Sequence, residues 1–183
     1  MKPSASGTIA TLRSVGTQKL PAAAFEAGLL AADWPARLQR LSQGRLMALV
    51  PEGSELWLDG GHNPDGGRAI AAALADLEER VSRPLVLVVA MLTSKDSAGF
   101  LRNFAGLARR VVGVPIRQPT TQPAAAIAAA AQSVGIPAES SATIEDALKA
   151  IGGFNLEQPP RILATGSLYF AGEVLAANGT IPE

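Results

Sequence analysis

The single histidine of the chain, His62, lies in the loop sequence DGGHNPDGG at residues 59–67. Asp59 and Asn63 lie close to it, and two glycines between them allow the backbone to approach a ligand closely. An imidazole, a carboxylate and a carboxamide in one short loop could bind a phosphate or a sugar, or orient an amine. The same residue types are common in turns, where Asp59 and Asn63 would only cap the following helix. The loop alone therefore leaves both interpretations open.

Two more polar clusters follow apolar runs of the sequence. Residues 93–96, TSKD, come after one such run, and residues 165–167, TGS, come after another. Lys95 would lie at a helix start, where a cation is electrostatically unfavourable unless it meets a carboxylate or a phosphate. Ser167 would open a helix whose first amide groups could bind an anion. In each case a solvated side chain or a plain helix cap is the alternative.

Arg37, in the sequence WPARLQ, lies outside these three clusters. A planar guanidinium suits bidentate contact with a phosphate, whereas a surface arginine on a short helix needs no ligand. Ser167, His62 and an aspartate could form a serine hydrolase triad, although the chain has no G-x-S-x-G sequence. Neither a G-x-x-x-x-G-K-[ST] phosphate loop nor a G-x-G-x-x-G dinucleotide motif occurs in the chain.

The composition narrows the chemistry further. The chain has no cysteine, which excludes disulfides, thiolate zinc sites and thiol nucleophiles, and one histidine excludes a multi-histidine metal site. The formal net charge is +0, so bulk charge does not favour nucleic acid or an anionic membrane. We expect no metal ligands, no nucleic-acid partner and no membrane partner. The start of the sequence lacks a signal-peptide pattern, and the longest apolar run, Pro84–Leu92, is too short to cross a bilayer. We therefore expect a cytoplasmic protein. We also expect a monomer.

Strand and helix patterns alternate along the chain and predict the elements that position these clusters. Helical spacing runs over residues 25–42 and is broken by Pro35. Two strands, at residues 45–50 and 55–59, flank a predicted hairpin turn. Continuous apolar runs predict buried strands at residues 84–91, 110–116 and 161–166. Amphipathic or capped patterns predict helices at residues 64–81, 94–110, 121–135, 143–154 and 167–179.

This alternation predicts an α/β fold with an open, mostly parallel, Rossmann-like sheet, helices on both faces and an N-terminal hairpin strand. The carboxyl ends of parallel strands meet at one edge of such a sheet, where ligands bind. The clusters at residues 59–63, 93–96 and 165–167 would therefore lie along the same edge. Their convergence favours a binding site more strongly than any one cluster does.

Four stretches of the sequence, taken together, resemble one known family. They are WPARLQRL, LWLDGGHNPDGGRAIAAAL, VVAMLTSKD and ILATGSLYFAGEVL, in this order. They resemble the C-terminal region of the folylpolyglutamate synthase and dihydrofolate synthase family, within the Mur ligase superfamily. The usual forms there are W-P-G-R-x-Q, D-G-A-H-N-P, K-D after a strand and T-G-S-L-Y. Two positions depart from these forms, because Ala36 replaces a glycine and Gly61 replaces an alanine. The resemblance implies a fold of the Mur ligase C-terminal domain type.

The resemblance also implies a division of the chain. Residues 25–183 correspond to the Mur ligase C-terminal, or glutamate-ligase, domain. Residues 1–24 correspond to a linker and a remnant of the preceding domain, since GTIATLRSVG is similar to that domain's final helix. In the family the preceding domain carries the phosphate loop and binds ATP and Mg²⁺, and this sequence contains neither that loop nor that domain's magnesium ligands. We therefore expect the chain alone to be inactive, as part of a longer ligase. The alternative is a stand-alone nucleotide- or glutamate-binding module that acts with a separate ATPase chain.

The family's reaction implies roles for the candidate residues. ATP phosphorylates the substrate carboxylate, and the amino group of L-glutamate then attacks the acyl phosphate, giving an amide, ADP and phosphate. The implied partners are ATP, L-glutamate, folate or dihydropteroate, and the missing ATPase domain. By this resemblance, Arg37 and Asp59 would contact ATP. His62 and Asn63 would be catalytic residues near the reacting groups, and Lys95 and Ser167 would bind the glutamate carboxylate.

Overall fold

The computed structural model of the chain describes residues 21, 23 and 35–180. The predicted domain boundary at residues 24 and 25 and most of the predicted helix over residues 25–42 lie outside the described residues. Ala36–Glu183 forms one compact unit, and all of the candidate site residues belong to it.

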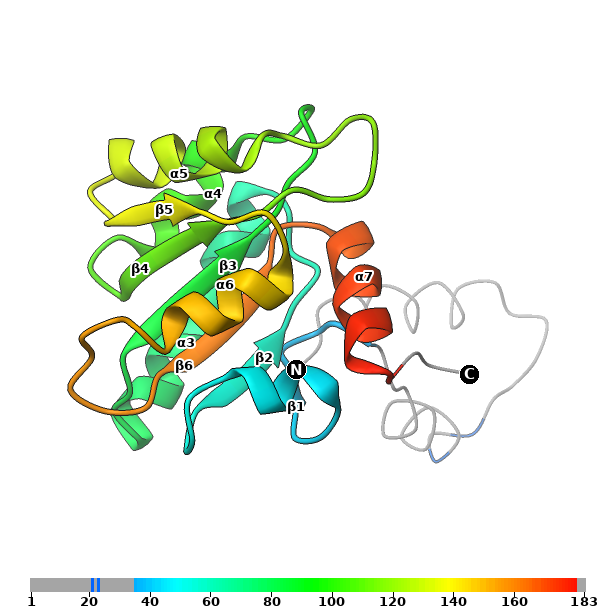
Figure 1. Cartoon of the computed structure of the whole chain (residues 1–183). Helices are drawn as coiled ribbons and strands as arrows, with labels where there is room; N and C mark the ends of the chain where they lie inside the picture. Colours follow the sequence, from blue (N-terminus) through cyan, green and yellow to red (C-terminus); the bar gives the residue numbers. More distant parts are fainter. Residues whose placement is uncertain (1–20, 22, 24–34, 181–183) are drawn as a thin grey trace. The chain divides into compact units, whose positions relative to one another are not determined.

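Six strands form one sheet in the order β1-β2-β6-β3-β4-β5 (Figure 1). The strands are β1 (Gln39–Leu41), β2 (Glu55–Leu58), β3 (Leu85–Val89), β4 (Ala108–Gly113), β5 (Ala138–Ser140) and β6 (Arg161–Thr165). β1 pairs antiparallel with β2, and every other pair in the sheet is parallel. The predicted α/β fold, with a mostly parallel sheet and an antiparallel strand near its N-terminus, is confirmed.

Helices cover both faces of the sheet, and two hydrophobic clusters fill the space between the layers. One face carries α3 (Pro64–Arg80), α4 (Ser97–Leu101), η2 (Arg102–Phe104) and α5 (Ala124–Ser133). The other face carries η1 (Arg45–Leu49), α6 (Ile144–Ile151) and α7 (Leu168–Asn178). Side chains of β3 point alternately to the two faces, so Val86 and Val88 join one cluster while Leu87 and Val89 join the other. All of β3 is buried because both faces are covered.

The predicted hairpin is wrong in one of its strands. Residues 45–50 form no strand, because Arg45–Leu49 is the 3₁₀ helix η1, and the antiparallel partner of β2 is β1, within the segment predicted as helical. The cause lies far away in the sequence. The Asn178 carboxamide in α7 accepts a hydrogen bond from Leu46 N at 3.0 Å and donates one to Gln43 O at 2.8 Å. These tertiary contacts outweigh the local strand preference of the segment.

Two further elements differ from the predictions. The helix predicted over residues 94–110 covers only α4 and η2, because Gly106 turns the chain with a φ of 81° and β4 begins at Ala108. The sequence pattern does not predict β5, which has three residues and none of them buried. The other predicted helices and buried strands are confirmed, with ends that shift by a few residues. No described helix has both the length and the apolar character needed to cross a membrane.

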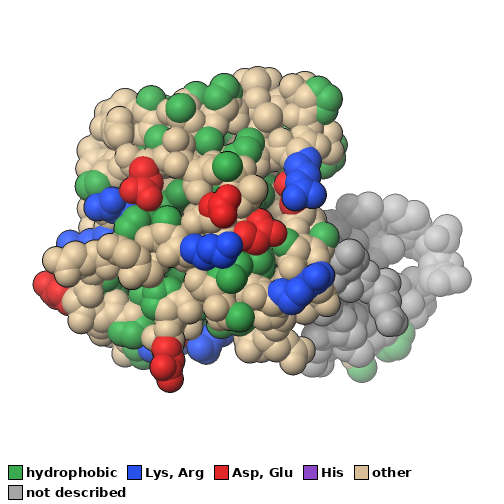
Figure 2. All heavy atoms as spheres, viewed as in Figure 1, with side chains coloured by type: hydrophobic (Ala, Val, Ile, Leu, Met, Phe, Trp, Pro, Cys, Tyr) green, Lys and Arg blue, Asp and Glu red, His purple; other side chains and the backbone are tan. Residues whose placement is uncertain are grey.

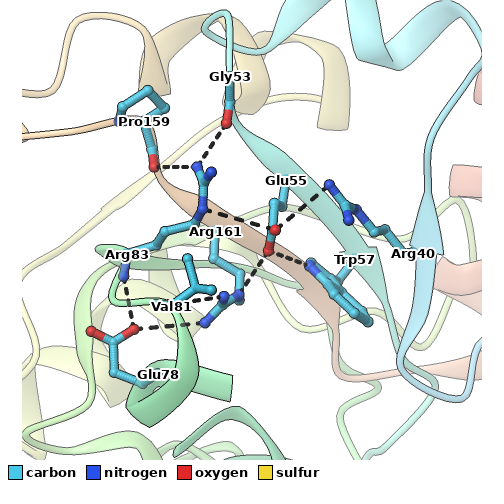
Figure 3. A network of polar contacts seen from close by, with 9 residues as sticks. All are labelled: Arg40, Gly53, Glu55, Trp57, Glu78, Val81, Arg83, Pro159 and Arg161. Carbon is cyan, nitrogen blue, oxygen red and sulfur yellow. Dashed lines mark hydrogen bonds and ion pairs between the residues drawn. The ribbon is translucent and has the colours of Figure 1, made fainter.

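A largely buried ionic network joins the amino ends of β2 and β6 (Figure 3). Arg161, which is 3% exposed, donates from Nε to Glu55 at 2.9 Å and from Nη2 to Val81 O at 3.2 Å. Its Nη1 lies 3.6 Å from a carboxylate oxygen of Glu78. Burial alone would raise the pKa of Glu55. Hydrogen bonds from Arg161 and Trp57, together with nearby positive charges, lower it by more, so the net pKa lies below its ordinary value.

Candidate functional site

At the opposite end of the sheet, a crevice lies at the carboxyl ends of the strands. β6 lies between β2 and β3 and is parallel to both. The chain leaves β2 and β3 toward α3 and α4 on one face, and it leaves β6 toward α7 on the other face. Such a divergence opens the usual ligand position of an open α/β sheet.

A cavity of about 150 Å³ lies in this crevice. Four of the residues that line it belong to the three polar clusters, namely His62, Lys95, Gly166 and Ser167, and the others are Leu92, Leu168 and Tyr169. The structure therefore brings His62, Lys95 and Ser167 together. Two larger cavities, of about 420 and 360 Å³, contain none of the candidate residues. Figure 2 shows acidic and basic side chains interspersed on the face that carries α6, so no broad field of one sign covers that face.

Asp59 is buried, and its carboxylate is bound by the backbone. Oδ1 accepts a hydrogen bond from Gly61 N at 2.7 Å, and Oδ2 accepts one from Leu38 N at 2.8 Å. Burial raises the pKa of Asp59, and these two hydrogen bonds and the charge of Arg37 lower it by less, so the net pKa is above its ordinary value. Asp59 thus joins the segment that contains Arg37 to the glycine loop that contains His62.

Arg37 lies in a tightly turned segment beside this carboxylate. Its side chain is exposed, and its neighbours Ala36 and Leu38 have left-handed φ values of 57° and 42°. Such conformations cost a non-glycine residue about 1–3 kcal/mol each and persist only where surrounding contacts hold them. Here the Asp59 bond to Leu38 N and a 2.9 Å bond from Gly60 N to Ala36 O provide those contacts. The left-handed φ at Ala36 also explains why a glycine suits this position in the family form W-P-G-R-x-Q.

His62 has one ring nitrogen held by the loop and lines the cavity. Nδ1 lies 2.9 Å from Gly60 O. Because a carbonyl oxygen can only accept, this contact places a proton on Nδ1, and the neutral ring then has Nε2 as a hydrogen-bond acceptor. Asn63 is exposed and caps α3, since its Oδ1 accepts a bond from Gly66 N at 2.7 Å. The structure thus shows that Asn63 caps the helix, and the catalytic role expected for it stays a prediction.

Lys95 and Ser167 approach the cavity from β3 and β6. The Lys95 side chain is partly exposed, and no ion pair within 4.0 Å joins it to any residue that the structure describes. Ser167 is 4% exposed and caps α7, because its Oγ accepts a bond from Tyr169 N at 3.1 Å. Its hydroxyl hydrogen is not used in that bond and can donate. Among the described residues no hydrogen bond joins Ser167 to His62, so the geometry gives no support to a serine hydrolase triad.

The turn before Ser167 requires a glycine. Gly166 has a φ of 108°, and a Cβ atom there would lie 2.5 Å from Ala90 O. Gly166 N donates to Gly61 O at 3.0 Å, which ties the first and third clusters together. Within residues 21, 23 and 35–180, no group of three or more His, Asp or Glu side chains could hold a metal ion.

Three apolar residues of the cavity, Leu92, Leu168 and Tyr169, were not predicted as site residues from the sequence. Leu168 and Tyr169 begin α7 and are 57% and 58% exposed, although both are large hydrophobic side chains. A Cβ atom at Gly60 would overlap the Leu168 side chain, so Leu168 covers the glycine loop. Nothing in the helical pattern separates these two residues from the buried residues of α7. Their exposure becomes visible only when the sheet edge is assembled.

Comparison with known proteins identifies the family of the chain. Residues 44–168, more than half of the chain, match the family described as "Mur ligase, glutamate ligase domain". The folylpolyglutamate synthase of Lacticaseibacillus casei is 31% identical over 149 residues, which are 80% of this chain and 30% of that protein. The chain therefore spans about a third or less of that relative's length.

Solved structures share the fold. The folylpolyglutamate synthase of Mycobacterium tuberculosis, solved with ADP and AMPPCP, has a TM-score of 0.72 at 25% identity, over 90% of this chain and 37% of that one. Escherichia coli FolC, solved with DHPP and ADP, has a TM-score of 0.76 at 20% identity, over 96% of this chain and 38% of that one. The resemblance to the C-terminal domain of folylpolyglutamate synthase, predicted from four short motifs, is confirmed. The chain belongs to the Mur ligase family, as its glutamate ligase domain.

Proposed function

We propose that the chain is the glutamate-side domain of an ATP-dependent ligase that joins L-glutamate to dihydropteroate or to a folate glutamate through an acyl phosphate. One observation carries the proposal: His62, Lys95 and Ser167 from three separate loops line one cavity at the carboxyl edge of the sheet. A cation, a hydroxyl donor and a hydrogen-bond acceptor around one cavity match the charges of an amino acid that must be held for reaction.

Each side chain would act on a different part of the substrates. The Lys95 ammonium and the Ser167 hydroxyl would bind the α- or γ-carboxylate of glutamate. The Nε2 atom of His62 would accept a hydrogen bond from the attacking amine and so orient it. Arg37 would contact a phosphate of ATP. Asp59, whose two carboxylate oxygens already accept backbone hydrogen bonds, would hold the Arg37 segment in place and meet the nucleotide only at its periphery.

Similar proteins support the choice of ligands. A folylpolyglutamate synthase/dihydrofolate synthase of Yersinia pestis was solved with Mn, AMPPNP and L-glutamate, and it shares the fold with a TM-score of 0.69 over 88% of this chain. We propose that ATP and Mg²⁺ are held mainly by an ATPase domain that this sequence does not include, and that the glutamate-ligase domain comprises residues 25–183. The chain alone would then release no phosphate from ATP in the presence of folate, glutamate and magnesium. Turnover by the isolated chain would contradict this part of the proposal.

Glutamate binding to the chain tests the proposal most directly. We expect L-glutamate to shift the backbone amide signals of residues 62, 95, 166 and 167 in a nuclear magnetic resonance titration. Lys95→Met should weaken that binding by about tenfold or more, because a charge-assisted hydrogen bond contributes roughly 1.5–3 kcal/mol. The matched control is Lys149→Met, since Lys149 is exposed on α6 and lies 4.0 Å from Asp146. Equal affinities for the two variants, or shifts confined to other residues, would refute the assignment of this cavity to glutamate.

A further inference from the structure

The turn that contains Lys95 is held by a neighbouring loop, between β4 and α5. Lys95 N donates to Leu92 O at 3.0 Å, which closes a turn over residues 92–95. Leu92 forms an isolated antiparallel bridge with Thr121, and Thr93 N donates to Thr120 O at 2.8 Å. The two loops therefore run side by side at the carboxyl ends of β3 and β4.

Gln122 makes the side-chain contacts between these two loops. Its Nε2 donates to Leu92 O at 3.0 Å and to Lys95 O at 2.9 Å, so both hydrogens of one amide group bind the two ends of the same turn. Its backbone N donates to Met91 O at 2.8 Å. Three bonds from one residue thus reach three carbonyl oxygens of the segment that leads from β3 to Lys95.

Gln122 is itself anchored on both sides. Before it, Thr121 Oγ1 accepts a bond from Ile116 N at 2.9 Å and ties the loop back to the end of β4. After it, Pro123 is the N-cap residue of α5, where its ring restricts φ, here −57°. A glutamine on such a fixed support can hold the turn over residues 92–95 in place.

We propose that Gln122 is a positioning residue, which holds the turn over residues 92–95 so that the Lys95 ammonium group stays at the cavity beside His62 and Ser167. The inference rests on the proposed function, because it assumes that Lys95 binds a carboxylate there. Gln122 touches no substrate in this role and acts only through the backbone of Lys95. The specific chemistry is the double donation of a primary amide, which no carboxylate or apolar side chain of equal length can make.

Two variants of equal length separate this role from simple packing. Gln122→Met keeps the length and removes both donors. Gln122→Glu places a carboxylate against two carbonyl oxygens and should displace the turn further. The control is Gln132→Met on α5, which removes a single 2.9 Å bond to Ala138 O far from the turn in the sequence. Thermal unfolding of all three shows that each is folded, and Gln122→Met decides the question if Gln122→Glu does not fold.

The position of Lys95 can be observed directly, because the chain has four lysines: Lys2, Lys19, Lys95 and Lys149. Carbon-13 dimethylation of the lysines gives one resolved signal per side chain, and a Lys95→Arg variant assigns the one that matters. We expect Gln122→Met to shift and sharpen the Lys95 signal toward that of the exposed Lys149. Gln122→Glu should shift it further, and Gln132→Met should leave it in place. An unchanged Lys95 signal in both Gln122 variants would overturn the proposal.

A glutamate titration of the unmodified variants adds the functional readout. Because the turn then loses both side-chain donors that hold it, we expect the Kd for L-glutamate to rise by about tenfold in Gln122→Met, with no change in Gln132→Met. A change of less than twofold, in a chain that does bind glutamate, would overturn the positioning role. If the wild-type chain shows no glutamate shifts and Gln122→Met still releases the Lys95 signal, the positioning of Lys95 stands and its proposed ligand is wrong.

Discussion

The two ends of the sheet use charged residues in opposite ways. At the amino ends of β2 and β6, the buried Arg161 finds hydrogen-bond and ion-pair partners inside the fold: Glu55, Glu78 and Val81 O. At the carboxyl ends, Lys95 is partly exposed at a cavity and has no ion pair among the described residues. The first arrangement neutralises a charge within the fold, and the second leaves a charge available to a ligand.

The two ends of the sheet also differ in backbone strain and in the pKa of a carboxylate. The carboxyl end contains the left-handed non-glycine residues Ala36 and Leu38, and buried Asp59 is occupied in holding main-chain amides. Strained turns and a carboxylate with a raised pKa both cost stability, and such costs cluster at binding sites. The amino end shows the opposite, because Glu55 has a lowered pKa and stabilises the fold in its ionised form. The buried ionic network and the proposed binding site thus lie at opposite ends of one sheet.

The largest expected effect is at the amino end. Arg161→Met should destabilise the folded chain by about 3–5 kcal/mol, because it leaves Glu55 partly buried without its main partner. Urea unfolding at pH 7, followed by circular dichroism, measures the loss. Arg40→Met is the control, since Arg40 is 55% exposed and lies 3.6 Å from the same carboxylate, and it should cost less than about 1 kcal/mol. Similar losses in the two variants would show that the network is not a buried stabilising unit.

The pH dependence of stability should have opposite signs at the two ends. The lowered pKa of Glu55 means that its stabilisation is present above its ordinary pKa of 4.5 and is lost as the pH falls through the folded value. The raised pKa of Asp59 means that its contribution is present below 3.8 and is lost as the pH rises through the folded value.

Two amide substitutions separate these contributions. Glu55→Gln should flatten the loss of stability between about pH 5 and pH 3. Asp59→Asn should make that loss steeper, because the contribution of Asp59 to stability grows as the pH falls and is absent in the variant. Urea unfolding at half-unit pH steps gives the slopes. If both substitutions change the slope in the same direction, the contrast between the two edges is wrong for these carboxylates.

The smallest effect is expected at the strained turn of the carboxyl end. Ala36→Gly should change stability by less than about 1 kcal/mol, and toward greater stability, because glycine adopts a φ of 57° without the steric cost that alanine has. Ala72→Gly is the matched control on the exposed side of α3, where it should destabilise by about 1 kcal/mol. Thermal unfolding of both variants checks the signs. A loss at Ala36 as large as that at Ala72 would show that the turn is unstrained.

Local patterns were sufficient for much of the fold and for part of the site. The continuous apolar runs of β3 and β6 and the capped starts of α3 and α6 need only neighbouring residues to be recognised. His62, Lys95 and Ser167 could be predicted as neighbours because parallel strands end at one edge. The segment of η1 could not, since Asn178 determines its conformation from 132 residues away. Gln122 has no motif of its own and was visible only through its two carbonyl partners.

By itself, the sequence determined the fold class and the family, and it predicted the loops proposed to form the site, because hydrophobic periodicity, helix caps and short motifs are local properties. Only the tertiary structure decided which contacts each polar side chain makes within the fold. It showed that Asp59 holds backbone amides, that Asn63 caps α3, and that Lys95 lines a cavity without an ion pair among the described residues. The physical reason is that burial and hydrogen-bond partners depend on segments that meet only after folding, and these contacts determine whether a charge stabilises the fold or is left to bind.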